Sequence, residues 1–175
     1  GSYTLIFTSG DASYETAYAF SMLYAKATGV TLKMKKDTIT EPTDKEIVIG
    51  KTNREEFYAI DHDSLVADAF VLALSGKRLF ISASSTSGYD AAFAEFFRQT
   101  IGIEDIEMLT KTDKKIELPE NFEMIAEPSV KLEENKTASG IPYSVAGGEP
   151  GAGNYYKFSE SISYYFKSNV GAGFN

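Results

Sequence analysis

The chain has 175 residues, of which 43% are hydrophobic, so it is long enough for one domain of ordinary size with a substantial core. It carries 25 acidic against 17 basic side chains, and the resulting net charge of -8 disfavours nucleic acid and anionic lipid surfaces as partners. The absence of Cys excludes disulfides, thiolate nucleophiles and Cys-based metal sites. No apolar run reaches the roughly 18 residues of a membrane span. We therefore expect a globular protein with no nucleic-acid partner and no membrane span.

The first predicted elements are a strand over residues 3–8 and a helix that begins near Asp11. The strand residues are mostly β-branched or aromatic and lead into Ser-Gly, as is typical of a strand that enters a turn. From Asp11 the apolar residues recur at helical spacing, with Asp11 as a candidate N-cap and Gly29 as a candidate left-handed C-terminal residue. A second strand is expected over residues 30–34.

A buried strand and a hairpin are predicted in the middle of the chain. Residues 46–50 form a short apolar run of the buried-strand type. Thr52 and Glu55 then have the spacing of a capping box, which predicts a short helix. Apolar residues alternate over 70–74 and again over 79–83, on either side of a Ser-Gly-Lys turn, and this indicates a hairpin.

The polar stretch 84–88 precedes a helix with aromatic residues at i, i+4, i+7 and i+8 from Tyr89, the apolar stripe of a helix packed on a sheet. Ser87 and Asp90 stand three positions apart, which is typical of a helix start. We interpret the stretch as an N-cap with a flexible Gly88, because capping accounts for these residues without a ligand. A binding loop is the alternative.

The composition changes near the C-terminal end. Residues 115–119, Lys-Ile-Glu-Leu-Pro, are predicted to form a strand closed by proline. Residues 126–154 are rich in Gly, Pro, Ser, Glu and Asn, which predicts a linker or a long loop. Over residues 155–175 aromatic and polar side chains alternate, so we expect a β-type segment that opens a further domain.

Motifs for catalysis or cofactor binding are scarce. The only histidine, His62, lies between two aspartates, and we interpret it as part of a solvated surface turn. The sequence contains no HExxH, no GxSxG and no P-loop, so we assign no metal-binding, cofactor-binding or catalytic residue and expect no cofactor. Ser87 at a strand-to-helix junction leaves serine hydrolase chemistry as a weak alternative.

Sugar chemistry has two further signals. Paired carboxylates would suit a glycosidase, but most acidic residues fall in charged runs on expected surfaces. Tyr155 and Tyr165, each from a tyrosine pair, are candidate stacking platforms for a glycan, because their rings offer flat apolar faces. The alternative is that one member of each pair packs into a core.

Five stretches of the chain carry a family resemblance: residues 46–54 (EIVIGKTNR), 68–72 (DAFVL), 76–83 (GKRLFISA), 87–97 (SGYDAAFAEFF) and 101–102 (IG). With the order of the expected elements, they resemble the small α/β domain ahead of the catalytic barrel in family 20 β-hexosaminidases and in α-glucuronidases. Residues 115–119 look like that family's connector toward its barrel. The resemblance extends over roughly residues 2–125.

The resemblance implies an α+β fold: a mixed β-sheet with two main helices packed on it, of zincin-like topology without a metal centre, followed by a loop-rich C-terminal segment with β character. It implies a non-catalytic accessory domain over residues 2–125 of a secreted or cell-surface carbohydrate-active protein. The expected partner is an adjacent catalytic domain of the same chain, with polysaccharide or another glycan as a further partner. In such enzymes the catalytic carboxylates belong to the barrel, so none is assigned here. The alternatives are an autonomous glycan- or protein-binding module and, ranked lowest, an independent hydrolase with paired carboxylates.

Overall fold

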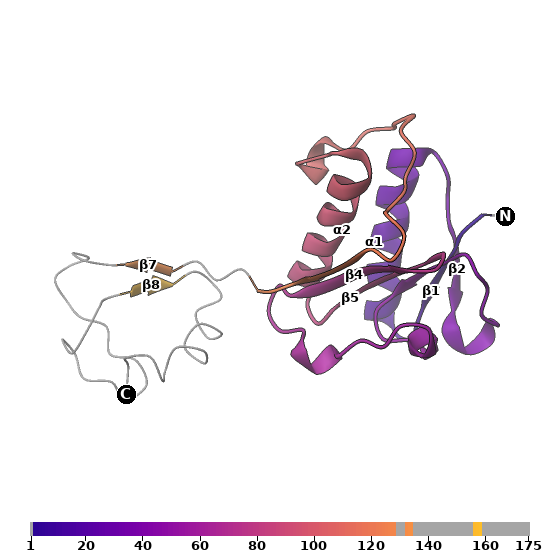
Figure 1. Ribbon diagram of the computed structural model, residues 1–175, viewed down its shortest axis with the longest axis horizontal. Coiled ribbons are helices and arrows are strands. Elements are labelled where there is room, and N and C mark those ends of the chain that lie inside the picture. Colours follow the sequence, from indigo (N-terminus) through magenta and orange to yellow (C-terminus); the bar gives the residue numbers. More distant parts are fainter. Residues whose placement is uncertain (1, 129–131, 135–155, 159–175) are drawn as a thin grey trace. The chain divides into compact units, whose positions relative to one another are not determined.

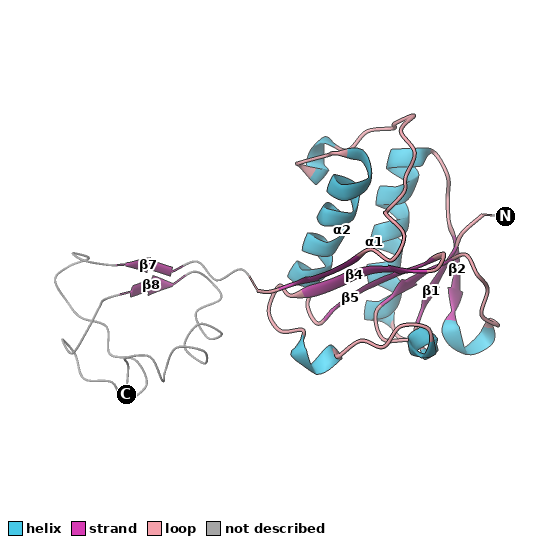
Figure 2. Ribbon diagram, in the orientation of Figure 1, coloured by secondary structure: helices cyan, strands magenta, loops and turns pink. Residues whose placement is uncertain are grey.

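The computed structural model describes residues 2–128, 132–134 and 156–158. The chain divides into two units, residues 1–128 and 129–175, and each is described by itself. In the first unit two helices lie side by side on one face of a β-sheet, and short irregular segments lie on the other face (Figure 1, Figure 2).

Six strands of the described part form one mixed sheet in the order β2-β1-β3-β5-β4-β6. These strands are β1 (Thr4–Phe7), β2 (Lys33–Lys36), β3 (Glu46–Ile49), β4 (Phe70–Ser75), β5 (Arg78–Ala83) and β6 (Glu123–Ala126). β1 pairs in parallel with β2 and β3, and β3 pairs in parallel with β5. β4 pairs antiparallel with both β5 and β6. The predicted α+β fold with a mixed sheet and two packed helices is confirmed.

The first helix, α1, spans Asp11–Thr28. Its C-cap is Gly29, as predicted; this residue has the left-handed φ of 75°, and its N–H donates to the carbonyl of Ala25 at 2.7 Å. Its N-cap is Gly10, at φ 127°, so the prediction of Asp11 as the cap is wrong by one position. Asp11 instead lies in the first turn, where its negative charge suits the positive end of the helix dipole.

The second helix, α2, spans Thr86–Ile101 and is capped by Ser85, whose hydroxyl accepts the N–H of Gly88 at 3.1 Å. The stretch is therefore a cap, as predicted, but Ser85 rather than Ser87 supplies it. Gly88 is not a flexible hinge. It is buried, and a Cβ there would lie 2.8 Å from both the Ala69 carbonyl oxygen and the Ala83 Cβ. Glycine is required because α2 approaches the sheet closely at this point.

The main core lies between the helices and the sheet. Alternate strand residues face the helices, among them Leu5, Ile47, Leu72 and Ile81, all at most 3% exposed. Phe20 of α1 meets three aromatic rings of the predicted stripe of α2. These are Phe93, Phe96 and Phe97, with centroids 5.1, 5.4 and 6.1 Å from that of Phe20. The aromatic rings thus hold both helices on the same face.

The opposite face of the sheet carries two smaller apolar clusters. Ile6, Val48 and Phe80 form one of them, and Leu65 with Ala69, Val71 and Ala73 forms the other. Tyr58 and Ile60 pack against both clusters. They come from the connection between β3 and β4, which contains the 3₁₀ turns η2 (Asn53–Glu56) and η3 (His62–Ser64). This connection therefore covers the face that the helices leave open.

Two predicted strands are displaced. The strand expected over residues 30–34 lies at Lys33–Lys36, and the 3₁₀ turn η1 (Asp37–Ile39) follows it. Residues 115–119 form no strand. Ile116 and Leu118 alternate because both pack against the helix-side core from an extended segment. That segment follows the 3₁₀ turn η4 (Ile106–Met108), and the strand itself, β6, begins at Glu123.

In the second unit β7 (Leu132–Glu134) pairs antiparallel with β8 (Tyr156–Phe158). β8 falls within the predicted β-type segment, and β7 falls within the predicted linker. The Gly-rich residues 147–153 lie outside the described residues, and the predicted boundaries at about 125 and 154 stay predictions. Over the ranges that the structure describes, no helix is both long and apolar enough to cross a membrane.

Candidate functional site

The predicted sugar-stacking residues Tyr155 and Tyr165 lie outside the described residues, so their role stays a prediction. One polar cluster of the described residues lies on the sheet face opposite the helices, at the amino ends of β3 and β5, and another lies near the carboxyl end of β5. They are built from the ends of β2, β3 and β5 and from the connection that covers this face.

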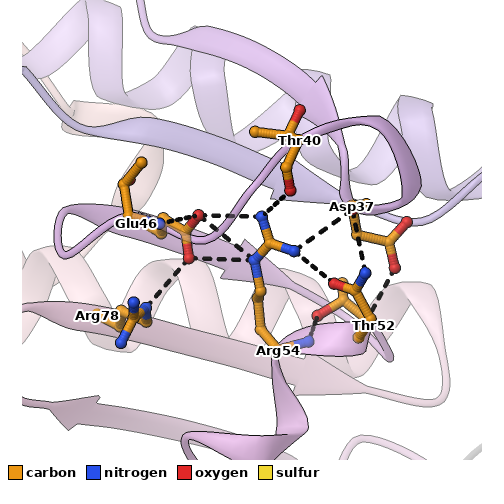
Figure 3. A network of polar contacts seen from close by, with 8 residues as sticks. Asp37, Thr40, Glu46, Thr52, Arg54 and Arg78 are labelled. Carbon is orange, nitrogen blue, oxygen red and sulfur yellow. Dashed lines mark hydrogen bonds and ion pairs between the residues drawn. The ribbon is translucent and has the colours of Figure 1, made fainter.

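A buried carboxylate, Glu46, lies between two arginines at the start of β3 (Figure 3). Arg54 Nη2 is 3.2 Å from Glu46 Oε1, and Arg78 Nε is 3.1 Å from Glu46 Oε2. Glu46 is 0% exposed and Arg54 is 1% exposed. Buried charges of this kind are tolerated because each one is paired and hydrogen-bonded, and removing a partner leaves an uncompensated charge.

Arg54 also binds the loop that follows β2. Its Nη2 donates to the carbonyl of Thr40 at 2.6 Å, and its Nη1 donates to the carbonyl of Asp37 at 3.3 Å. A third bond runs from Nη1 to the side-chain oxygen of Asn53 at 2.6 Å. One guanidinium therefore joins β3, the loop after β2 and the covering connection (Figure 3).

The turn η2 directs Arg54 beneath the sheet. Thr52 is its N-cap, and the Thr52 hydroxyl accepts the N–H of Arg54 at 3.1 Å, so this half of the predicted capping box is confirmed. The N–H of Asn53 donates to Asp37 Oδ2 at 3.0 Å. Glu55 does not close the box as predicted, because its carboxylate bonds to His62 instead.

His62 lies in the predicted turn, but the prediction that it is solvated is wrong. The side chain is 17% exposed, because η3 folds onto the open face of the sheet. Its Nε2 contacts the carboxylate of Glu55, and its Nδ1 lies 3.2 Å from the hydroxyl of Ser82. Both ring nitrogens therefore have partners within the domain.

The order Glu55, His62, Ser82 resembles the acid, base and hydroxyl of a hydrolase triad. Ser82 is 0% exposed, however, so its hydroxyl is out of reach of a substrate. The Ser82 hydroxyl also bonds to the phenol of Tyr89. Burial raises the pKa of this phenol, whereas its hydrogen bonds to the Ala83 backbone and to Ser82 act in the opposite direction. The hydrogen bonds of Ser82 thus anchor η3 and α2 to β5. Ser87, the alternative candidate for a nucleophilic serine, forms a hydrogen bond with the Ser85 hydroxyl at 3.1 Å and not with His62.

A cavity of about 340 Å³ opens at the carboxyl ends of β1, β3 and β5. Ligands of α/β sheets often bind at such strand ends. Its lining includes Thr8, Gly50, Lys51, His62 and Tyr89. Gly50 has φ 76° and a Cβ there would lie 2.9 Å from the Tyr89 hydroxyl oxygen, so glycine makes room for this phenol.

The described part of the chain offers no metal centre, because no three acidic or imidazole groups within it lie close enough to hold an ion. A glycosidase needs two accessible carboxylates at a fixed separation. Glu46 is inaccessible and bound to two arginines, and Glu55 is bound to His62. The carboxylates of Glu46 and Glu55 therefore form ion pairs that hold segments of the domain together.

Sequence reasoning missed the network of Glu46, Arg54 and Arg78. The sequence did contain a signal. Glu46 and Arg78 each begin an apolar strand, and each lies two positions before a buried residue, Val48 and Phe80, so it is expected on the same face of the sheet as that residue. The pairing of Ile47 with Leu79 then brings these two charged residues to equivalent positions on adjacent strands. The pairing of β3 with β5 joins strands that are not consecutive in the sequence, because β4 lies between them along the chain. It could therefore be seen only in the structure.

Neither a family model nor a curated protein matches the sequence. The structure is similar to that of BtGH115A, described as a novel family GH115 4-O-methyl-α-glucuronidase with specificity for decorated arabinogalactans. The TM-score is 0.50 and the sequence identity is 23%. The match covers 74% of this chain and 18% of the other, so this chain spans a small part of that enzyme's length. The likeness shows a shared fold with part of an α-glucuronidase; the likeness to β-hexosaminidases stays a prediction.

Proposed function

We propose that residues 2–125 form a non-catalytic accessory domain of a carbohydrate-active protein, and that this domain supports an adjacent glycoside hydrolase module. The observation that carries the proposal is the shared fold with part of a GH115 glucuronidase, in which the matched region is 18% of the chain. An extracellular or cell-surface location and a polysaccharide as the enzyme's substrate belong to the same proposal.

The described polar groups support a structural role. The most deeply buried charges, Glu46 and Arg54, fix the connection that covers one face of the sheet. Ser82 and His62 serve the same purpose at the end of β5. A domain that positions a neighbour needs a rigid framework of this kind and no reactive group of its own.

A second candidate is an autonomous glycan-binding module, and one observation favours it. Tyr14 and Tyr18 of α1 are 49% and 48% exposed, and their rings are stacked with centroids 6.0 Å apart and an interplanar angle of 14°. Each exposed ring has a flat apolar face of the kind on which a sugar ring can stack. Tyr155 and Tyr165 remain candidates for the same role.

A paired experiment separates these functions. The 175-residue chain is tested for hydrolysis of aryl glycosides, including an aryl α-glucuronide, and for binding to a broad glycan array. The accessory role predicts no turnover and no saturable binding by the folded chain. Saturable binding that is lost in folded Tyr14→Ala and Tyr18→Ala, or in Tyr155→Ala and Tyr165→Ala, would establish the binding module instead. Turnover would establish the independent hydrolase.

A further inference from the structure

The outward side of α1 carries a stripe of residues that the fold of the domain does not use. At about 3.6 residues per turn, the stripe consists of Asp11, Glu15, Tyr18, Met22 and Lys26. It lies opposite the side of α1 that is buried in the core. In its middle Tyr18 is 48% exposed and Met22 is 54% exposed. A surface helix usually has polar residues at such positions, so the apolar middle of this stripe indicates a contact surface.

Two further residues border the apolar middle of the stripe. The ring of Tyr14 stacks on that of Tyr18, with centroids 6.0 Å apart, and this contact restrains the Tyr18 ring before any partner binds. A side chain that is already restrained loses less entropy on association. Ala19, on the other border, is exposed and small. A large and a small residue at adjacent positions suit the packing of one helix against another, in which side chains of one surface enter the grooves of the other.

The charges of the stripe are separated along the helix. Asp11 and Glu15 lie in its amino-terminal half and Lys26 lies in its last turn. All three are exposed, and none has an ion pair or a side-chain hydrogen bond with another residue of the described ranges. This distribution suits the dipole of α1 itself. It also makes the stripe complementary to a second, antiparallel copy of itself, whereas a parallel copy would place like charges together.

One antiparallel register satisfies the whole stripe. With a two-fold axis between Tyr18 and Ala19, these two positions of one helix lie opposite Ala19 and Tyr18 of the other. Asp11 then lies opposite Lys26 of the second copy, and Glu15 lies opposite Met22, one turn away from the same lysine. Opposite charges therefore meet at both ends, and a large residue faces a small one in the middle. A self-complementary patch of this kind is what a two-fold dimer requires.

We propose that the outward side of α1 is the contact of a homodimer, in which α1 packs antiparallel against α1 of a second copy of this chain. The proposal does not depend on the accessory function. A contact of one helix per copy is small, and each copy has a net charge of -8, so the dissociation constant should be on the order of 100 µM. The ion pairs at the two ends fix the direction and the register of the contact more than they add to its strength.

The test is sedimentation velocity of the 175-residue chain at concentrations from about 10 µM to about 1 mM, over which the sedimentation coefficient should rise from that of a monomer toward that of a dimer. Lys26→Glu makes the stripe wholly acidic and should weaken association at least about ten-fold. Lys77→Glu, in the exposed turn between β4 and β5, changes the net charge equally and should leave association unchanged. Circular dichroism checks that each variant is folded.

A mixture of two variants tests the register directly. The double variant Asp11→Lys, Glu15→Lys has a wholly basic stripe and should associate with itself as poorly as Lys26→Glu does. An equimolar mixture of the two should form a heterodimer, because the acidic stripe of one complements the basic stripe of the other. A misfolded variant cannot produce this recovery.

Four results would overturn the proposal. They are a wild-type chain that stays monomeric throughout, association that Lys26→Glu leaves unchanged, a variant mixture that stays monomeric, and association that folded Tyr18→Ala leaves unchanged. Saturable binding of a glycan by the monomeric wild type, lost in Tyr18→Ala, would assign the stripe to a sugar and would also overturn it. Glycoside turnover by the chain bears on the accessory function alone, so the two proposals fail separately.

Discussion

Arg78, the first residue of β5, donates from its Nε to Glu46, the first residue of β3, over 3.1 Å and across 32 positions of sequence. Arg54 reaches the same carboxylate from the connection that follows β3. The three side chains tie the centre of the sheet to the segment that covers its second face. Glu46 and Arg54 are the most deeply buried charges of the described residues, and the stability of the fold should depend on them.

Removing the shared carboxylate should destabilise the domain strongly. In Glu46→Gln the buried Arg54 loses its counter-charge, and such a loss costs about 3–5 kcal/mol. Urea unfolding of the variant and the wild type measures the difference. Glu117→Gln is the matched control, because Glu117 is 58% exposed and pairs with an exposed lysine, so its free energy of unfolding should change by less than about 1 kcal/mol. Equal effects of the two variants would contradict the account.

The position of the α2 cap can be tested by two serine substitutions. Ser85→Ala removes the acceptor of the Gly88 N–H and should cost about 1 kcal/mol. Ser87→Ala, two positions further on, should cost less than about half of that, because Ser87 is exposed and caps no N–H. Thermal unfolding of both variants decides which serine is the cap. The reverse order would restore the assignment that the sequence suggested.

Gly88 should not tolerate a methyl group. In Gly88→Ala the new Cβ would lie 2.8 Å from the Ala69 carbonyl oxygen, so α2 must move away from the sheet. Overpacking of this kind costs about 1–3 kcal/mol. Thr86→Ala, an exposed change in the same turn, is the control. A stabilised Gly88→Ala variant would show instead that this glycine only adds freedom to the unfolded chain.

The pair of Glu95 and Arg98 on α2 predicts a small dependence of stability on pH. The bond from Arg98 holds the pKa of the Glu95 carboxyl below its ordinary value, although partial burial acts in the opposite direction. A lowered folded-state pKa stabilises the fold above the unfolded pKa, and this contribution is lost as the pH falls through the folded pKa.

Glu95→Gln should therefore lower the melting temperature slightly near neutral pH and have no effect at a pH well below the ordinary carboxyl pKa. The neutral-pH difference should correspond to less than about 0.5 kcal/mol, because Arg98 is 42% exposed and the pair lies at i, i+3. Melting curves at both pH values, with the exposed Glu120→Gln as the control, provide the check. A difference that grows toward acidic pH would contradict the assignment.

Local patterns predicted what depends on neighbours in sequence. Gly29 ends α1 because glycine accepts a left-handed conformation, and the alternation around the Ser-Gly-Lys turn produced the hairpin of β4 and β5. The aromatic stripe of α2 gave its buried face. Each of these patterns depends only on residues that are close in sequence. The tertiary structure is consistent with them, so the local prediction was correct.

Tertiary packing decided the rest. The spacing of Ser87 and Asp90 pointed to Ser87 as the α2 cap, but in the structure the hydroxyl of Ser85 accepts the N–H of Gly88. Ile116 and Leu118 alternate like strand residues, but they pack as an extended segment against the helix-side core. His62 became half-buried because its turn folds onto the sheet, a long-range event that its polar neighbours did not signal.

The proposed accessory function is tested most directly by measuring whether the polypeptide that contains this chain hydrolyses glycosides, and how fast heating abolishes that turnover, with and without residues 2–125. The account predicts that the protein without these residues keeps its catalytic groups but loses activity faster on heating, because a supporting surface is gone. Loss of all turnover from a protein that remains folded, together with turnover by the isolated 175-residue chain, would place the catalytic groups here and contradict the account.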